Sequence, residues 1–457
     1  MNTNGNPSKH KHLVGLEDAI QRPAPGLSAP ASIHFSPDDR LVTYLYAAEG
    51  GLTQNLYAHE IETGQTRLLA APPDANMKEG QLSPEEELLR ERMRQVSLGI
   101  TQYIWDQKYG RILIPYQGSL YILDRPGEPL RLLFGCAGKP ALDPQFSPDG
   151  SQVSFVQDAE LYVMPVEGGE PRQITEGARG TGKTHGLAEY IAQEEMSRMR
   201  GYWWSEDSRW IAFTEVDETH IPVYRIVHQG KDQPGENAQE DHRYPFAGAA
   251  NAVVRLAVVS AQGGQPVWMQ YDARQYEYLA RVKWLPDGRL SAQLENRLQD
   301  TLVLAVFDPR TGKSTELLKE TSPIWINLHD MLTPLKKLSG QEQAGFLWAS
   351  ERSGYRHLYL YDAYGQLIRQ ITSGDWMVDE LCGVDEQNGW VYFTSTAADV
   401  REKHLYRAPL QGGPAEQITT EKGQHQIVLD HAKTRFVDTF TSLSQPVTVN
   451  LHSLPEG

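Results

Sequence analysis

Hydrophobic and polar residues alternate with a period of two along most of this chain, in short runs separated by turn-forming residues. One phrase returns four times: an aromatic residue, a turn containing aspartate, and then an alternating run. The four copies are FSPDDRLVTYLY (35–46), FSPDGSQVSFVQ (146–157), WSEDSRWIAFTE (204–215) and WLPDGRLSAQLE (284–295). A strand that ends at a tight turn and resumes with period-two alternation predicts a β-hairpin.

A second phrase closes many of these units: a Leu-Tyr strand, a glycine turn and a polar strand, as in AELYVMPVEGGEPRQIT (159–175) and KHLYRAPLQGGPAEQIT (403–419). Units that recur every ~40–60 residues indicate four-stranded blades around a central axis. We therefore predict an all-β fold, an eight-bladed β-propeller with short helical insertions. The eight predicted units are residues 32–70, 98–134, 142–175, 200–270, 278–318, 323–373, 379–419 and 424–453.

This pattern divides the chain into three parts. We expect an N-terminal segment at 1–31, loose unless a further domain holds it, a propeller domain at 32–453 and a short tail at 454–457. Two stretches inside the propeller depart from the strand pattern and predict helices. They are SPEEELLRERMRQVS (83–97) and THGLAEYIAQEEMSRMR (184–200). Insertions on a rigid scaffold often carry function, so both are candidate site segments.

GARGTGKT (177–184) matches a phosphate-binding loop letter for letter. Such a loop acts only between a buried parallel strand and a helix. The residues before it are polar and alternating, whereas a buried parallel strand would be continuously apolar. A nucleotide hydrolase is therefore a remote alternative. We expect instead a flexible glycine turn that allows residues 184–200 to extend away from the ring.

Composition narrows the class of partner. The formal charge of −16 argues against nucleic acid or an anionic membrane surface and would suit a cationic ligand. Cys136 and Cys382 allow at most one disulfide and no disulfide framework. Without a recognisable signal peptide or a run of ~18 apolar residues, we expect a cytoplasmic protein, unless an exporting leader has been removed.

Glu194 and Glu195 stand next to each other in the second insertion. On a continuous helix adjacent side chains diverge by ~100°, so the two carboxylates would meet one ligand only if the helix ends or distorts there. The alternative is an ordinary solvated helix face.

Several longer strings resemble the dipeptidyl peptidase IV family of serine exopeptidases, most closely its dipeptidyl peptidase 8 and 9 branch and bacterial relatives. They run in order over about four-fifths of the chain, between residues 84 and 453. The strings are EEELLRERMRQVSLGITQY, QEEMSRMRGYWW, VDETHIPVYRI, RYPFAGAANAVVRL, EYLARVKW, SPIWINLHD and SGYRHLYLYD.

The resemblance implies roles for particular residues. In that family a glutamate pair on a propeller helix holds the free α-ammonium of a peptide, and the matching residues here are Glu194 and Glu195. An ammonium has three donors, which two carboxylates and one further acceptor saturate. An arginine from the other insertion meets a substrate carbonyl oxygen. Arg94 is the best match, with Arg90 and Arg92 as second choices, and surface salt bridges with neighbouring glutamates are the alternative.

The family's catalytic half has no counterpart in the sequence. Its nucleophile lies in Gly-x-Ser-x-Gly, and the chain has no such string; the nearest, GLSAP (26–30), ends in proline. We therefore expect no catalytic residue, cofactor or metal in this chain, and no activity of the chain alone.

The resulting hypothesis is a substrate-gating and N-terminus-anchoring propeller of an exopeptidase that releases Xaa-Pro or Xaa-Ala dipeptides. The alternative is a stand-alone propeller that binds peptides or proteins without cleavage. The implied partners are a peptide with a free N-terminus, a C-terminal α/β-hydrolase domain and, in the complete protein, a second copy in a homodimer. No nucleic acid or membrane partner is expected.

Overall fold

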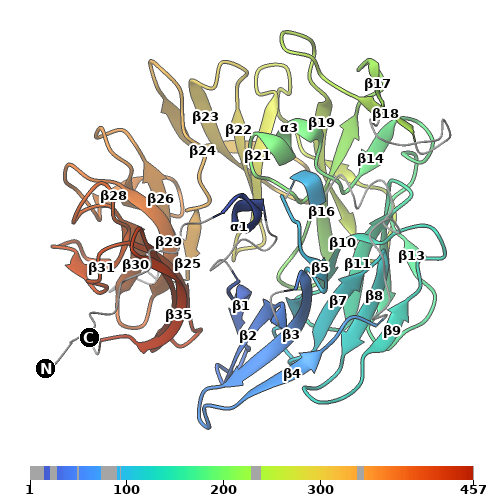
Figure 1. Cartoon of the computed structure of the whole chain (residues 1–457). Coiled ribbons are helices and arrows are strands. Elements are labelled where there is room, and N and C mark those ends of the chain that lie inside the picture. Colours follow the sequence, from blue (N-terminus) through green and yellow to red (C-terminus); the bar gives the residue numbers. More distant parts are fainter. Residues whose placement is uncertain are drawn as a thin grey trace, which may run out of the picture.

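The chain forms a ring of β-sheets in the computed structural model (Figure 1). Among the described residues, eight sheets are blades and a ninth is the separate hairpin β17–β18. The predicted all-β, eight-bladed propeller is confirmed. The described residues are 15–20, 28–48, 51–73, 90–92, 94–227, 238–336 and 344–455.

Apart from blade four, the blades are antiparallel meanders, and in Figure 1 the first strands β1 and β10 lie nearer the middle of the ring than the last strands β4 and β13. Blade one consists of β1 (Ala31–Phe35), β2 (Leu41–Tyr46), β3 (Thr53–Glu60) and β4 (Thr66–Ala70), and β5 (Leu98–Gly99) pairs in parallel with β3. Blade two consists of β6 (Ile104–Trp105), β7 (Ile112–Tyr116), β8 (Ser119–Leu123) and β9 (Arg131–Phe134). Blade three consists of β10 (Leu142–Phe146), β11 (Gln152–Gln157), β12 (Glu160–Pro165) and β13 (Arg172–Gln173).

The fourth blade contains the insertions that concern the site. Its strands are β14 (Lys183–His185), β15 (Tyr202–Trp204), β16 (Trp210–Asp217), β19 (Val253–Ser260) and β20 (Val267–Trp268), and the hairpin is β17 (Val223–Val227) with β18 (Gln239–Arg243). Blades five and six are β21 (Tyr278–Trp284), β22 (Leu290–Glu295), β23 (Thr301–Phe307), β24 (Ser314–Thr321), and β25 (Thr333–Leu335), β26 (Gly345–Ser350), β27 (His357–Asp362), β28 (Leu367–Gln370).

The last two blades differ in strand number within the described part of the chain. Blade seven has four strands and blade eight has three. They are β29 (Val378–Asp385), β30 (Trp390–Ser395), β31 (His404–Pro409), β32 (Glu416–Gln417), and β33 (Gln424–Leu429), β34 (Arg435–Ser442), β35 (Gln445–Ser453). The named helices are short: α1 (Leu16–Ile20), near the middle of the view in Figure 1, and α3 (Tyr190–Glu194).

The repeated turn phrase makes the same hydrogen bonds in three blades. A serine hydroxyl donates to the aspartate two residues later and accepts the backbone N–H five residues later. The serine-to-aspartate distances are 2.6 Å for Ser36–Asp38, 2.6 Å for Ser147–Asp149 and 2.7 Å for Ser205–Asp207. The phrase therefore fixes each hairpin locally, which is why its period reveals the fold.

The core lies between blades. Alternate residues of a strand face the two neighbouring blades: Leu290, Ala292 and Leu294 of β22 pack in one cluster with residues of β16 and β19. Leu302 and Leu304 of the next strand pack instead against the sixth blade. Because both faces of each blade are covered, insertions at strand ends are set on a rigid body.

The observed boundaries differ slightly from the expected ones. Ala31 already belongs to β1, and Leu454, expected in the tail, is buried beside blade seven. In the first predicted helix, residues 90–92 are helical and 83–89 lie outside the described residues. Both cysteines are free, so the disulfide that the sequence allowed does not form. No helix among the described residues is long and apolar enough to cross a membrane.

The ring closes between blades one and eight through side chains. Phe35 and Val42 pack on Val437. The Asp39 carboxylate accepts backbone N–H groups of His431 and Ala432, each at 2.9 Å, and the His431 Nδ1 at 2.7 Å. Burial raises the pKa of Asp39, but these hydrogen bonds outweigh it and the pKa is lowered.

We predict that Asp39→Ala lowers the free energy of unfolding by about 2 kcal/mol at pH 7, because it removes charge-assisted hydrogen bonds across the closure. Since the folded pKa lies below the ordinary value, this contribution should vanish as acid protonates Asp39. Urea unfolding at pH 7 and at low pH measures both effects. Asp38→Ala is the control, because Asp38 bonds only within its own turn; equal losses in the two variants would contradict the closure role.

Candidate functional site

Both ends of the second insertion are anchored to the same strand, β16. Strand β14 pairs with one end of β16, His185 opposite Glu215, and β15 with the next part, Tyr202 opposite Phe213. The inner strand of blade four is therefore interrupted, and residues 186–201 leave and return beside Thr214. The Gly186 N–H donates to the Thr214 carbonyl at 2.9 Å, and the Thr214 N–H to the Gly201 carbonyl at 2.8 Å.

The two glycines at this root are required by close packing. A Cβ on Gly201 would lie 2.4 Å from backbone carbons of Gly186 and Leu187. Gly186 has φ +82°, a conformation that other residues rarely adopt. The insertion thus starts from a rigid base.

The glycine stretch before the insertion is also held in place. The Glu160 Oε1 accepts the backbone N–H groups of Ala178 at 2.7 Å and Arg179 at 3.2 Å. Its Oε2 accepts the Thr175 hydroxyl at 2.7 Å and contacts His185 Nδ1 at 2.9 Å. Burial raises the pKa of the Glu160 carboxyl, but these donors prevail and lower it to about 2. A carboxylate of this chain therefore occupies the loop's N–H groups.

Two expectations about this stretch are wrong. It is not a flexible linker, because Glu160 accepts its backbone N–H groups and its last residues belong to strand β14, which pairs with β16. The helix is also shorter than predicted: Lys183–His185 is an antiparallel strand, and α3 covers only Tyr190–Glu194. Lys183 lies 3.2 Å from Asp217 and 3.7 Å from Glu215. The strand-loop-helix context of a nucleotide site is absent at this stretch.

The glutamate pair lies where α3 ends. Glu195 is the C-cap residue, and both glutamates are exposed. Ser197, at φ 53°, reverses the chain, so the Arg198 N–H donates to the Ala192 carbonyl at 2.8 Å. The apolar face of the turn, Ala192 and Met196, packs on Ala280 of β21 together with Tyr278 and Leu328. Burial of one face leaves the pair on the other.

A buried arginine holds the ends of the insertion together. Arg198 Nη2 lies 2.8 Å from Glu189 Oε2, and both side chains are at least 95% buried. Its Nε donates to the Leu279 carbonyl at 3.0 Å and its Nη1 to the Arg200 carbonyl at 2.8 Å. Sequence reasoning missed Glu189 and Arg198, because nine residues separate them and no helical spacing links them.

One arginine from the first insertion reaches the pair. Arg92 Nε lies 3.8 Å from Glu194 Oε1, its Nη1 donates to Gln193 Oε1, and its guanidinium lies 5.3 Å from the Tyr190 ring centre. Arg94 is exposed at φ 52°, and its backbone N–H donates to the Glu91 carbonyl. The Arg90 Nη2 donates to the Ser97 carbonyl. The contact thus falls on Arg92, which sequence reasoning placed below Arg94.

Aromatic rings extend the site toward the hairpin. Tyr190 and Tyr244 meet edge to face at 5.2 Å, and Tyr244 meets Phe246 at 5.3 Å. The hydrogen bond with Tyr244, burial and the nearby Glu194 charge together raise the pKa of Tyr190 to about 12. Tyr190 therefore stays neutral beside the pair.

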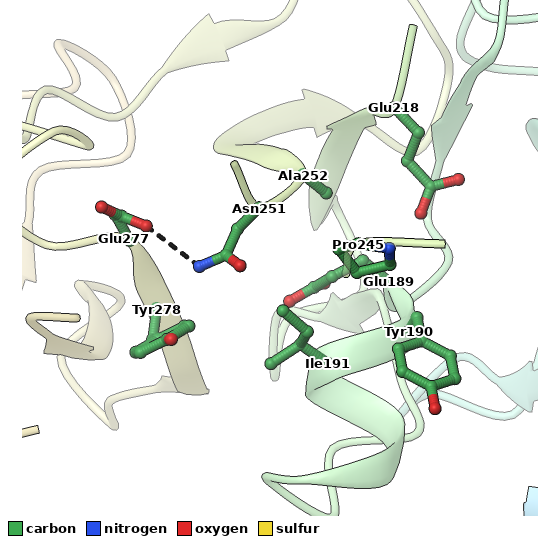
Figure 2. A pocket seen from close by; sticks show the side chains of 9 residues that line it. All are labelled: Glu189, Tyr190, Ile191, Glu218, Pro245, Asn251, Ala252, Glu277 and Tyr278. Atoms are coloured by element: carbon green, nitrogen blue, oxygen red, sulfur yellow. Dashed lines mark hydrogen bonds between the residues drawn. The ribbon is translucent and has the colours of Figure 1, made fainter. Parts of the chain in front are cut away.

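A small pocket lies at the N-terminal end of α3 (Figure 2). Asn251 Nδ2 donates to Glu277 Oε2 at 2.9 Å across it. Burial and the Glu189 charge raise the pKa of Glu218. The lining residues are Glu189, Tyr190, Ile191, Glu218, Pro245, Asn251, Ala252, Glu277 and Tyr278. Among the described residues no group of three or more His, Cys, Asp or Glu side chains could hold a metal ion.

The fold and site define a class: an eight-bladed propeller whose fourth blade presents two adjacent carboxylates beside an arginine from another insertion. Residues 109–447 match the family model described as the dipeptidyl peptidase IV (DPP IV) N-terminal region. This match covers most of the chain, so the chain belongs to that family and corresponds to its propeller region.

Individual relatives agree with this assignment. Human dipeptidyl peptidase 8 is 26% identical over 468 residues, which cover 83% of this chain and 51% of that protein. A probable dipeptidyl peptidase 4 of Aspergillus flavus is 29% identical over 57% of this chain and 35% of that protein. The crystal structure of Porphyromonas gingivalis dipeptidyl peptidase 4 shares the fold, with a TM-score of 0.74 at 22% identity over 94% of this chain and 59% of that one. The chain thus spans about half the length of human dipeptidyl peptidase 8.

We predict that Arg198→Met destabilises the protein by about 3 kcal/mol, because it leaves the Glu189 carboxylate buried without its partner. Chemical unfolding of wild type and variant measures the loss. Arg209→Met is the control, since Arg209 is mostly exposed and 3.6 Å from Asp207. A loss as small as in the control would show that the buried pair does not hold the insertion.

Proposed function

We propose that this chain anchors the free N-terminus of a peptide through Glu194 and Glu195, as the substrate-gating propeller of a dipeptidyl peptidase IV-like serine exopeptidase. The observation that carries the proposal is the exposed carboxylate pair at the end of α3, fixed from below by β21 and Arg198. A protonated α-amino group is a compact cation with three donors, and two acidic side chains on a rigid turn suit it.

The anchoring chemistry links binding to the choice of bond. If the amine is held at a fixed place, a nucleophile at a fixed distance cleaves after a set number of residues. In this proposal an α/β-hydrolase domain supplies that nucleophile and most of the pocket for the second residue. Release of Xaa-Pro or Xaa-Ala dipeptides would then be the reaction of the combined protein, and the isolated chain would bind weakly and hydrolyse nothing.

Arg92 has a second part in the proposal. Its guanidinium lies within reach of Glu194 and above the Tyr190 ring, so one of its donors can turn to a substrate carbonyl oxygen while its charge stays paired. Arg94 was the first choice on sequence grounds, and its exposed position gives it no comparable contact in the described part of the chain.

We predict that the 457-residue chain binds Ala-Pro weakly and that acetylating the peptide amine abolishes binding. The cause is the loss of the ammonium, which cannot be replaced by a neutral amide beside two carboxylates. Calorimetric or NMR titration of both peptides provides the measurement. Glu194→Gln and Glu195→Gln should each weaken binding at least tenfold, and Glu206→Gln, an exposed glutamate elsewhere on blade four, should not. Equal binding of free and acetylated peptide would exclude the proposed anchor.

We predict a separate effect of the arginine. Arg92→Met should weaken binding of the free peptide several-fold, whereas Arg94→Met should leave it within twofold, because Arg92 contacts Glu194 and Arg94 has no such contact within the described residues. The same titration with the two variants measures the difference. The reverse order would assign the role to Arg94, as the sequence first indicated.

A further inference from the structure

A buried acid lies beneath the site without a partner. Glu295, the last residue of β22, is fully buried, and neither of its carboxyl oxygens has a hydrogen bond within the described residues. The buried amide oxygen of Gln293, two residues earlier on the same face, also lacks a donor. Buried polar groups are nearly always hydrogen-bonded, and an unpaired buried charge is unfavourable. The arrangement therefore favours a neutral, protonated Glu295.

Arg281 lies opposite Gln293 in the neighbouring strand β21. Its Nη1 donates to the Met196 carbonyl and to the Ala280 carbonyl, each at 2.8 Å. Its Nε and Nη2 pair with the exposed Asp330, with 3.3 Å between Nη2 and Oδ2. Met196 directly follows Glu195, so this guanidinium holds a backbone carbonyl next to the pair.

We propose that Arg281 is a positioning residue that fixes the Met196 carbonyl, and through it the Glu194–Glu195 turn, and that the buried carboxyl of Glu295 controls how firmly it does so. The proposal rests on the proposed function, since it concerns the affinity of the same site. While Glu295 is neutral, the guanidinium stays on Met196 and Asp330. When Glu295 ionises, the new buried charge attracts the guanidinium and weakens its bond to Met196.

The surroundings of Glu295 leave Arg281 as the responding cation. Tyr278 and the apolar Leu302 stand directly opposite on the two neighbouring strands. Arg297, in the following turn, is engaged by Glu277 at 3.3 Å and the Ala249 carbonyl at 2.7 Å.

Further titratable groups lie in the segment before β25, and Arg356 beside His329 is paired with Glu351 at 3.3 Å. Burial lowers the pKa of His329 to about 4, so that imidazole stays neutral near pH 7, and Asp330 is already paired with Arg281. Burial raises the pKa of Glu295 to about 7, and Gln299, which lies near without completing a hydrogen bond, and Arg281 oppose this only in part. The switch is therefore centred at about pH 7.

The test compares the pH profile of Ala-Pro binding in wild type and Glu295→Gln on both sides of the Glu295 pKa, from about pH 5.5 to about pH 8.5, with the 457-residue chain. The glutamine cannot ionise, so wild-type affinity should fall at least threefold more than that of the variant as pH rises. Both proteins share every other titrating group and the same peptide amine, so the ratio isolates Glu295. Arg281→Met should weaken binding and flatten the profile, and Arg281→Lys should restore part of the affinity. Lys283→Met is the matched control, because Lys283 lies on the same strand and donates to the Leu332 carbonyl instead.

Thermal unfolding supplies a readout without peptide. Burial makes ionised Glu295 unfavourable in the folded state and so raises its pKa. The resulting loss of folding stability is absent below the ordinary pKa of 4.5 and complete above about pH 7. Glu295→Gln should therefore gain stability relative to wild type as pH rises. If wild type and Glu295→Gln show the same pH profile of binding while free and acetylated peptides are still distinguished, the role of Glu295 is overturned and the proposed function is not. Failure to distinguish the two peptides in any protein would overturn the proposed function, and a stability difference independent of pH would show that Glu295 does not titrate.

Discussion

The site depends on one constraint, the pairing of both ends of the insertion with a single strand. Because β14 and β15 share β16, residues 186–201 begin and end beside Thr214, where Gly186 and Gly201 touch. A loop whose two ends meet has little conformational freedom, and two guanidinium groups restrict it further. The buried Arg198 pairs with Glu189 and bonds to the Leu279 carbonyl, and Arg281 of β21 bonds to the Met196 carbonyl. A five-residue helix, too short to be stable alone, is thereby held as part of the propeller.

Local patterns predicted the fold, and contacts distant in sequence escaped prediction. The Ser-x-Asp turns act within a few residues, so their repetition revealed hairpins, and together with the Leu-Tyr closing phrase it gave the number of blades. The flexible glycine turn was a wrong prediction, because the group that holds the glycine stretch, Glu160, precedes it by 18 residues. Residue types and family resemblance led to the glutamate pair. The choice among three arginines in one short segment depended on where each side chain points, which composition and spacing do not determine.

The charges around α3 differ in how well they are paired. Three of the nearby carboxylates are paired: Glu189 with Arg198, Asp330 with Arg281, and Glu160 with His185 and two backbone N–H groups. Those pairs are structural. In the stretch GARGTGKT, the backbone N–H groups of Ala178 and Arg179 bind the Glu160 carboxylate of the same chain. Glu194 and Glu195 differ, since within the described part of the chain the two exposed carboxylates have one arginine contact, at 3.8 Å.

This imbalance determines what the pair can bind. With Arg92 near Glu194, the three groups carry one net negative charge, which one ammonium neutralises. A second full cation or a neutral amide would leave charge unmatched, and an anion would be repelled. Arg92 also stacks on Tyr190, so it can shift from Glu194 toward a carbonyl oxygen without losing all of its partners. An ammonium followed by a carbonyl oxygen is the backbone of any peptide N-terminus, which is why the proposed function assigns the first group to the glutamate pair and the second to Arg92.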